Sequence, residues 1–353
     1  MPSMIALHNS FGGQRRDTLD DAAGRDSGVR FGHFDDSARE YVITTPRTPY
    51  PWINYLGTEE FFGLISHLGG GYSFYRDARM RRLTRYRYNN VPTDTGGRYF
   101  YVNDGGDIWT PTWAPVQADL DHFEARHGLS YTVITGERNG VRIETTYLVP
   151  LGTTAEIHRV RVSNTSETDK SVKLFSFAEF NLWNAFDDQT NYQRNLSLAE
   201  VEVDGSTIYH KTEYRERRDH YAVHSVNAPV AGFDTDRESF FGIYGKWDAP
   251  DVVVAGRSRN SVASGWAPIG SHQLNVELSP GESRDFVFVL GYVENAPDDK
   301  WESPGIVNKA PARALLDRFS TSEQVDAAMA ELRRYWDGLL ATYTAATGDE
   351  RVD

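Results

Sequence analysis

One short stretch of the sequence concentrates side chains that could contact a polar ligand. Asp187–Asn195 (DDQTNYQRN) combines carboxylates, amides, a tyrosine and an arginine, and it contains no aliphatic side chain. It directly follows Phe175–Phe186 (FSFAEFNLWNAF), an apolar run that predicts a buried strand. Arginine presents several donors in a fixed fork, and an amide offers both a donor and an acceptor. The stretch therefore suits a ligand rich in hydroxyl groups, and a solvated loop is the alternative.

Two further stretches, Tyr75–Asn90 and Tyr209–Val223, mix arginine with tyrosine. Sugars have apolar C–H faces that aromatic rings can cover, and they have hydroxyl groups that polar side chains can bind. Arginine in alternation with aromatic residues is also typical of the outer face of a β-strand, where it pairs with glutamate on a neighbouring strand. Ligand contact and a structural role both stay open for these stretches.

Pairs of carboxylates are the groups that glycoside chemistry requires, and three pairs occur in the sequence. Asp35-Asp36, Asp187-Asp188 and Asp234-x-Asp236 are paired only by adjacency, so we predict that they shape loops. The histidines show no metal-binding spacing, no phosphate loop or nucleophile elbow occurs, and cysteine is absent. We therefore assign no catalytic residue, no metal site and no cofactor.

The composition and net charge of the chain exclude some classes of binding partner. The chain has 353 residues, a net charge of −13 and an isoelectric point near 5.3, which argue against nucleic acid and against an anionic membrane surface. No apolar run approaches the roughly 20 residues of a membrane span. Residues 1–29 are polar and lack the apolar core of a secretory signal, so we predict a disordered or over-extended start. The absence of cysteine agrees with a cytoplasmic protein.

The elements that must position these residues are predicted to be mainly β. Gly140–Pro150 alternates apolar and polar side chains, which is the period of a half-buried strand. Asn139-Gly140, Asp204-Gly205 and Asp104–Gly106 have the composition of hairpin turns. Arg284–Val293 is apolar on both faces and predicts a central strand. Strands that recur about every ten residues indicate a large antiparallel β-sandwich over residues 30–295.

A helical pattern replaces the β pattern in residues 296–353. A Pro- and Asp-rich piece comes first, then a short helix in 310–319, then Thr321–Tyr343 with apolar residues in steps of three and four. Ser320 and Glu323 fit a capping box at the start of this second helix. Whether the helix folds back on the sandwich or faces a partner is left open by the pattern.

Several long motifs resemble one known family. They are YVITTPRTPYPWINYLG, GGYSFYRDARMRRLTRYRYNN, ADLDHFEARHGLSY, NLWNAFDDQTNYQRNLS and YHKTEYRERRDHYAV. Together they are similar to the N-terminal region of the cellobiose phosphorylases, inverting disaccharide phosphorylases of glycoside hydrolase family 94. The resemblance runs from about Arg30 to the C-terminus.

The resemblance implies a large N-terminal super-sandwich and a helical linker, which in the family lead to an (α/α)6 catalytic barrel. This chain would be truncated before that barrel, so no catalytic residue is carried over and we expect no activity from the chain alone. The implied parent reaction converts cellobiose and phosphate to glucose 1-phosphate and glucose, without a metal or organic cofactor. Family members form homodimers in which a sandwich loop contacts the acceptor sugar, and that loop matches Gln193 and Arg194.

Two functions from other classes remain as alternatives. A free-standing carbohydrate-binding module would bind sugar without an enzymatic role. A self-sufficient glycoside-cleaving enzyme would need two carboxylates roughly 5–10 Å apart in a groove.

Overall fold

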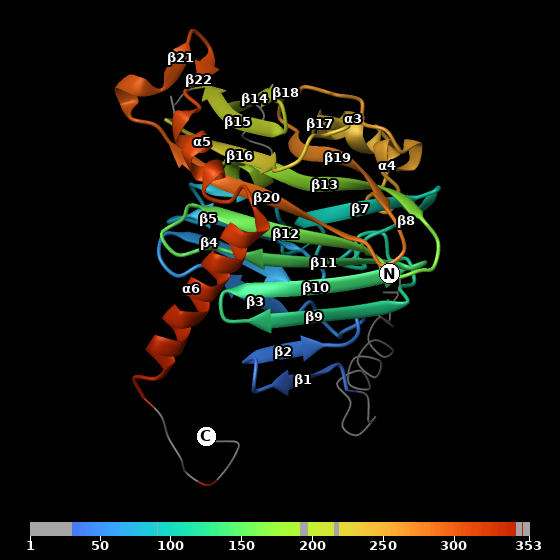
Figure 1. Ribbon diagram of the computed structural model, residues 1–353. Helices are drawn as coiled ribbons and strands as arrows, with labels where there is room; N and C mark the ends of the chain where they lie inside the picture. The colour runs from blue at the N-terminus through green and yellow to red at the C-terminus, as the bar shows by residue number, and fades with distance from the viewer. Residues whose placement is uncertain (1–29, 90, 191–196, 215–218, 344–347, 349–353) are drawn as a thin grey trace, which may run out of the picture.

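The computed structural model describes residues 30–89, 91–190, 197–214, 219–343 and 348. Two large antiparallel sheets pack face to face, and helices cover parts of both outer faces (Figure 1). This arrangement confirms the prediction of a mainly β protein built as a large sandwich that is followed by C-terminal helices. Within the described residues every ladder between named strands is antiparallel, as expected for strands joined by short turns.

The first sheet has eleven strands, and its two longest strands are buried on both faces over part of their length. In spatial order it contains β1 (Gly32–Asp35), β2 (Glu40–Ile43), β9 (His122–Gly128), β10 (Tyr131–Arg138), β11 (Val141–Leu148), β12 (Ala155–Asn164), β20 (Ser283–Glu294), β16 (His220–Val226), β15 (Thr207–Tyr214), β14 (Ser197–Asp204) and β18 (Ser264–Gly265). The position of β20 between β12 and β16 confirms the central strand predicted from its two apolar faces. In β11 the buried and exposed side chains alternate from Val141 to Thr145, as its period of two predicts.

The second sheet has nine strands, and it carries the apolar run that precedes the polar stretch. It contains β17 (Gly232–Asp236), β19 (Pro268–Leu278), β13 (Lys170–Trp183), β6 (Arg82–Thr84), β5 (Gly71–Tyr75), β4 (Phe61–Ser66) and β3 (Ile53–Leu56), with β7 (Arg98–Asp104) beside β13 and β8 (Asp107–Trp109) beside β7. Its central strand β13 is almost continuously buried from Leu174 to Trp183. The end of β13 therefore delivers the chain from the core directly to the surface.

Three clusters of buried apolar side chains hold the layers together. The largest lies between the two sheets and includes Phe100, Val160 and Phe288. A second lies between the outer face of the first sheet and the C-terminal helices α5 (Ala310–Asp317) and α6 (Ser322–Leu340). The third lies under two short helices, α3 (Arg237–Phe241) and α4 (Asp251–Ala255), on the outer face of the second sheet.

The C-terminal segment begins with a 3-10 turn, η2 (Pro297–Asp299), and a small hairpin of β21 (Trp301–Ser303) and β22 (Ile306–Val307). The second helix, α6, packs the first part of its apolar stripe on the sandwich, where Val325 and Leu332 are buried. Its last turns continue past the sheet, and Leu339 and Leu340 are exposed (Figure 1). Thr321 rather than Ser320 caps the helix, and Gln324 rather than Glu323 completes the capping box.

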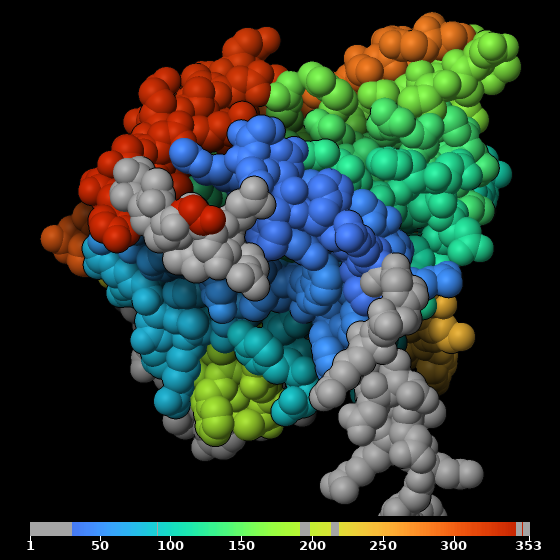
Figure 2. Space-filling model, turned by 90° about the horizontal axis from the view of Figure 1, so that it is seen from below, coloured from blue at the N-terminus to red at the C-terminus, as the bar shows by residue number. Residues whose placement is uncertain are grey.

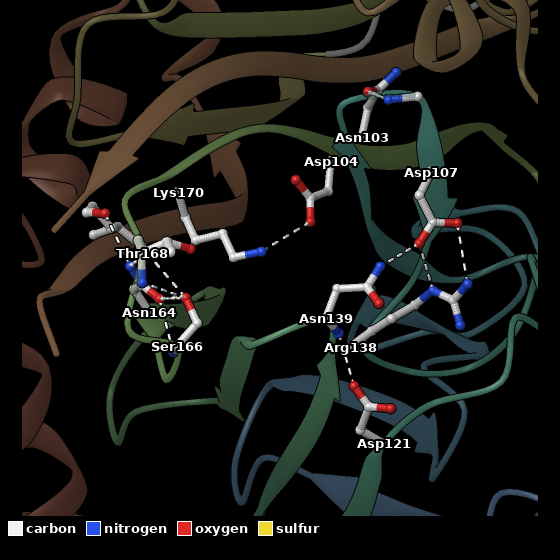
Figure 3. A network of polar contacts seen from close by, with 12 residues as sticks. Asn103, Asp104, Asp107, Asp121, Arg138, Asn139, Asn164, Ser166, Thr168 and Lys170 are labelled. Carbon is white, nitrogen blue, oxygen red and sulfur yellow. Dashed lines mark hydrogen bonds and ion pairs between the residues drawn. The ribbon is translucent and has the colours of Figure 1, made fainter. Parts of the chain in front are cut away.

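The end of α6 lies next to the first hairpin of the described chain. The space-filling view shows the end of α6 beside the turn between β1 and β2 (Figure 2), where Arg39 and Asp337 form an ion pair. At the other end of the sandwich, polar contacts tie the hairpin turns together (Figure 3). There Asp107 accepts hydrogen bonds from Arg138 and Asn139, and Lys170 lies 3.8 Å from Asp104. The turns predicted at Asn139-Gly140, Asp204-Gly205 and Asp104–Gly106 all occur between paired strands.

Candidate functional site

An open cavity of about 470 Å³ lies where β13 meets the polar stretch. We call it the α2 cavity, after the short helix α2 (Ala185–Gln189) that forms one of its sides. The loop that follows β6 forms a second wall, and the region around β17 and α3 forms a third. The lining residues are Arg85, Tyr86, Arg87, Val91, Pro92, Thr95, Gly96, Glu179, Asn181, Leu182, Asp188, Gln189, Arg237, Glu238, Trp247, Trp266 and Ala267.

Arg85 is the centre of the hydrogen-bond network in the α2 cavity. Its guanidinium group binds both carboxylate oxygens of Asp188, with Nε–Oδ2 and Nη2–Oδ1 distances of 2.8 and 2.7 Å. Its Nη1 lies 3.0 Å from Oε1 of Glu179, and its Nη2 donates to the carbonyl oxygen of Trp266. The two carboxylates more than offset the effect of burial, so the pKa of Arg85 is raised. The hydrogen bonds of the Arg85 guanidinium group thus connect α2, β13 and the loop before β19.

The short helix α2 replaces the first part of the loop predicted for Asp187–Asn195. Asn184 caps the helix by accepting from the backbone N–H groups of Phe186 and Asp187, which are free at a helix start. Asp187 accepts from the Asn184 side chain, and Asp188 binds Arg85. Both aspartates therefore shape the local structure, as predicted, although they do so from a helix.

Two hydrogen bonds link α2 to the opposite wall of the cavity. Arg87 donates to the carbonyl oxygen of Gln189 at 2.5 Å, and the Gln189 side chain donates to the carbonyl oxygen of Tyr86 at 3.3 Å. Arg85, Tyr86 and Arg87 all come from the predicted Arg- and Tyr-rich stretch Tyr75–Asn90. Part of that stretch thus lines the cavity, whereas Arg76 pairs with Glu60 elsewhere on the surface.

The described part of the second Arg- and Tyr-rich stretch, Tyr209–Val223, supplies no lining residue of the α2 cavity. Within its described part, Lys211 pairs with Glu200 and Glu202. His210 is buried and lies against Phe180 and Trp183. Lys211 and His210 therefore have structural roles.

Asn181 is a polar residue that sequence reasoning did not select. It is 2% exposed and lines the cavity, and its Oδ1 atom has no hydrogen-bond partner among the described residues. A buried acceptor without a partner costs free energy, so this atom would gain from a ligand hydroxyl or a water molecule. Its place inside the apolar run FNLWN was the one available signal. Trp247, Trp266 and Arg237 carried no sequence signal, because they come from other parts of the chain, Arg237 from the start of α3.

The charges that line the cavity balance. Three arginines, Arg85, Arg87 and Arg237, face three carboxylates, those of Glu179, Asp188 and Glu238. Glu179 is shared, since it also lies 3.3 Å from Nε of Arg237. A cavity with no net charge and with two tryptophan rings suits a neutral polar ligand better than a phosphate group.

The two residues predicted to bind substrate, Gln193 and Arg194, lie outside the described residues. Their described neighbours are Gln189, which lines the α2 cavity, and Thr190, which ends α2 as its C-cap. The segment that carries both residues therefore leaves directly from the cavity rim and returns to the sheet at Ser197.

In the other carboxylate pairs, Asp35, Asp234 and Asp236 have structural hydrogen-bond partners. Asp35 accepts from Ser37 and Ala38 in a turn, and Asp36 belongs to the same turn. Asp234 accepts from Arg259 and Ser261, and Asp236 caps α3 by accepting from the Ser239 N–H group. Among the residues that the structure describes, no group of three or more His, Asp or Glu side chains could hold a metal ion. No described helix is long and apolar enough to cross a membrane.

Comparison with known proteins agrees with this architecture. Residues 39–322 match the profile of the glycosyl hydrolase 94 supersandwich domain. The chain is 33% identical over 331 residues to an N,N'-diacetylchitobiose phosphorylase of Vibrio furnissii, which covers 92% of this chain and 39% of that protein. It is 28% identical over 305 residues to a solabiose phosphorylase of Paenibacillus borealis, which covers 84% of this chain and 40% of the relative.

A solved structure described as a kojibiose phosphorylase from the human microbiome shares the fold, with a TM-score of 0.50 and 9% identity over 87% of this chain and 39% of that one. The chain thus spans about two fifths of the length of the curated relatives that it matches. The supersandwich match over most of the chain, together with the two sheets and the C-terminal helices, places the chain in glycosyl hydrolase family 94.

Proposed function

We propose that this chain is the supersandwich part of a disaccharide phosphorylase, and that the α2 cavity and the segment after it form one edge of a sugar site. The reaction would convert a disaccharide and phosphate to a sugar 1-phosphate and a monosaccharide. Catalytic groups would come from a longer protein, because no pair of free carboxylates is seen in the described cavity. The chain would act in the cytoplasm as part of a homodimer.

The observation that carries the proposal is the lining of the α2 cavity. Trp247 and Trp266 offer rings for the C–H face of a sugar, and Asn181 offers a buried acceptor without a described partner. The balanced charge favours a neutral sugar, as in cellobiose or N,N'-diacetylchitobiose, over one that carries a carboxylate or a phosphate. The family membership supports a phosphorylase rather than a free-standing binding module.

Gln193 and Arg194 are proposed to contact the acceptor sugar in the site of the neighbouring subunit. Arg194→Ala, placed in a full-length phosphorylase that carries this domain, is expected to lower kcat/KM by roughly tenfold to a hundredfold, since a charge-assisted hydrogen bond contributes about 1.5–3 kcal/mol. The melting temperature should stay the same. Unchanged turnover would remove Arg194 from the sugar site.

Sugar binding by the chain itself provides a direct test. Titration with cellobiose, N,N'-diacetylchitobiose and glucose 6-phosphate, followed by tryptophan fluorescence and calorimetry, should show binding of the neutral sugars alone. Trp266→Ala should weaken that binding roughly twofold to tenfold, because a ring that covers a sugar face contributes roughly 0.5–1.5 kcal/mol.

Trp301→Ala provides the matched control, since Trp301 is similarly exposed but lies on the β21 hairpin and does not line the cavity. Equal loss of binding in both variants, or binding of glucose 6-phosphate alone, would contradict the proposed site.

A further inference from the structure

The wall of the α2 cavity opposite α2 contains a buried carboxyl group that the proposed function does not use. Asp94 lies between the lining residues Pro92 and Thr95, and it is 4% exposed. Its backbone has a φ of 63°, in the left-handed region that aspartate adopts only occasionally. Such local strain persists only where the surrounding structure holds the residue in place.

The Asp94 carboxyl group connects the wall to the last residue of β4. Ser66 donates to its Oδ2, and Tyr86, itself a lining residue, donates to its Oδ1 at 2.9 Å. The carbonyl oxygen of Asp94 accepts from the Tyr99 hydroxyl group. Gly70 packs so closely against the carboxyl group that a Cβ atom there would lie 2.2 Å from Oδ1. The carboxyl group therefore fits its site tightly.

Asp94 has no ion pair among the described residues, and Arg98, whose charge acts on its carboxyl group, is bound to Glu156 at 2.6 Å. Burial raises the pKa of the Asp94 carboxyl group to about 6, although the hydrogen bonds from Ser66 and Tyr86 and the charge of Arg98 oppose this. The titratable groups that face it are Tyr86 and Tyr99, whose pKa values are raised by burial, and the guanidinium group of Arg98. Only Asp94 in this cluster changes charge between pH 5 and 8.

A count of lone pairs shows where a proton on Asp94 must go. The hydroxyl oxygen of Ser66 accepts from the backbone N–H groups of both Leu68 and Gly70, at 3.1 Å each. A hydroxyl oxygen has two lone pairs, so Ser66 can only donate to Asp94 and cannot accept its proton. The proton must therefore lie on Oδ1 and point at Tyr86, and Tyr86 must change from donor to acceptor. The charge-assisted bond from Tyr86 is then lost.

We propose that Asp94 is a positioning residue that holds the Arg85–Gly96 wall of the α2 cavity through Tyr86, and that protonation of its carboxyl group loosens this wall and weakens sugar binding. The effect of Asp94 on the wall does not depend on the presence of a sugar. Only the effect on sugar binding rests on the proposed function, so the two parts can fail separately.

Amide hydrogen exchange in peptides that cover residues 85–97 tests the wall without any ligand. Asp94→Asn mimics the protonated group, because the amide nitrogen can donate to Tyr86 while the amide oxygen accepts from Ser66. At pH 8 the backbone amides of this wall should exchange about tenfold faster in Asp94→Asn than in the wild type. At pH 5 the exchange rates of the two proteins should be equal. Tyr86→Phe should exchange fast at both pH values. Equal rates in the wild type and Asp94→Asn at pH 8 would overturn the proposal.

Asp234→Asn is the matched control. Asp234 is also fully buried with a raised pKa, caused by burial, and it binds Ser261 but lies outside the cavity lining. It should leave exchange in residues 85–97 unchanged at every pH, and a change there would show a general effect of buried carboxylates and contradict a specific role for Asp94.

A second arm measures cellobiose affinity, which should fall between pH 8 and pH 5 in the wild type and stay constant in Asp94→Asn. A pH-dependent wall without any sugar binding would retain Asp94 as a positioning residue and reject the sugar site.

Discussion

At the scale of single residues, Arg85 holds the α2 cavity together. Its fork neutralises Glu179 and Asp188, whose side chains are 9% and 7% exposed. Arg85→Ala would leave Asp188 buried without its cation and Glu179 with Arg237 alone, so we expect a loss of about 3–5 kcal/mol in the free energy of unfolding. Arg85→Lys keeps the charge but cannot bind both oxygens of Asp188, so it should fall between the wild type and alanine. Urea unfolding at pH 7 measures both variants.

Arg76→Ala is the control for Arg85, because Arg76 pairs with Glu60 on the open surface. It should leave the unfolding midpoint almost unchanged, as exposed ion pairs contribute little. Equal effects of Arg76→Ala and Arg85→Ala would show that the network beside α2 is no more than a surface ion pair.

The contacts of Arg85 also show what the sequence could and could not predict. The hairpin turns were predictable because Asn139-Gly140 and Asp204-Gly205 specify their backbone shape locally. Arg85 and Asp188 are 103 residues apart, and no local rule pairs them. The sequence indicated that Tyr75–Asn90 and Asp187–Asn195 were polar and aromatic, but only the packing of β6 beside β13 brings them to one cavity.

At the scale of elements, α6 divides into a half that packs on the sandwich and a half that does not. Leu332 is fully buried against the outer face of the first sheet, whereas Leu339 is 48% exposed. Leu332→Ala should therefore lower the free energy of unfolding by about 2–5 kcal/mol through a cavity. Leu339→Ala should change it by less than about 0.5 kcal/mol. Guanidinium unfolding of both variants measures this difference, and equal effects would mean that α6 does not pack as described.

The amphipathic period predicted this helix but not which part of its stripe is buried. Leu332 and Leu339 occupy the same stripe in the sequence, and only the length of the sheet beneath them makes them differ. The start of the helix shows a similar limit, because the sequence of residues 320–324 contains two overlapping capping boxes, Ser320 with Glu323 and Thr321 with Gln324. The structure uses Thr321 with Gln324, whose side chain also reaches the Ser320 N–H group.

At the scale of the whole molecule, buried histidines set the response to acid. Burial lowers the pKa of His210 and His272 to about 3 and that of His127 to about 4, and it lowers the pKa of His224 well below its usual value. The unfolded chain binds these protons near pH 6.5, so their contribution to stability is fully present above that pH and is lost as the pH falls. Asp94 acts in the opposite direction, since its raised pKa favours the folded state as the pH falls below about 6.

The balance between these groups predicts steep acid unfolding. Near pH 5 the four histidines take up about four protons on unfolding and Asp94 releases about one, which gives a net uptake of about three. Stability should then fall by about 4 kcal/mol per pH unit, which is large beside the roughly 5–15 kcal/mol of a typical domain. We therefore expect the protein to be folded at pH 5 and to unfold between roughly pH 3.5 and 4.5. Calorimetry in two buffers of different ionisation enthalpy at pH 5 counts the protons directly. A net uptake near zero, or a protein that stays folded at pH 3.5, would show that these histidines are not held neutral in the core.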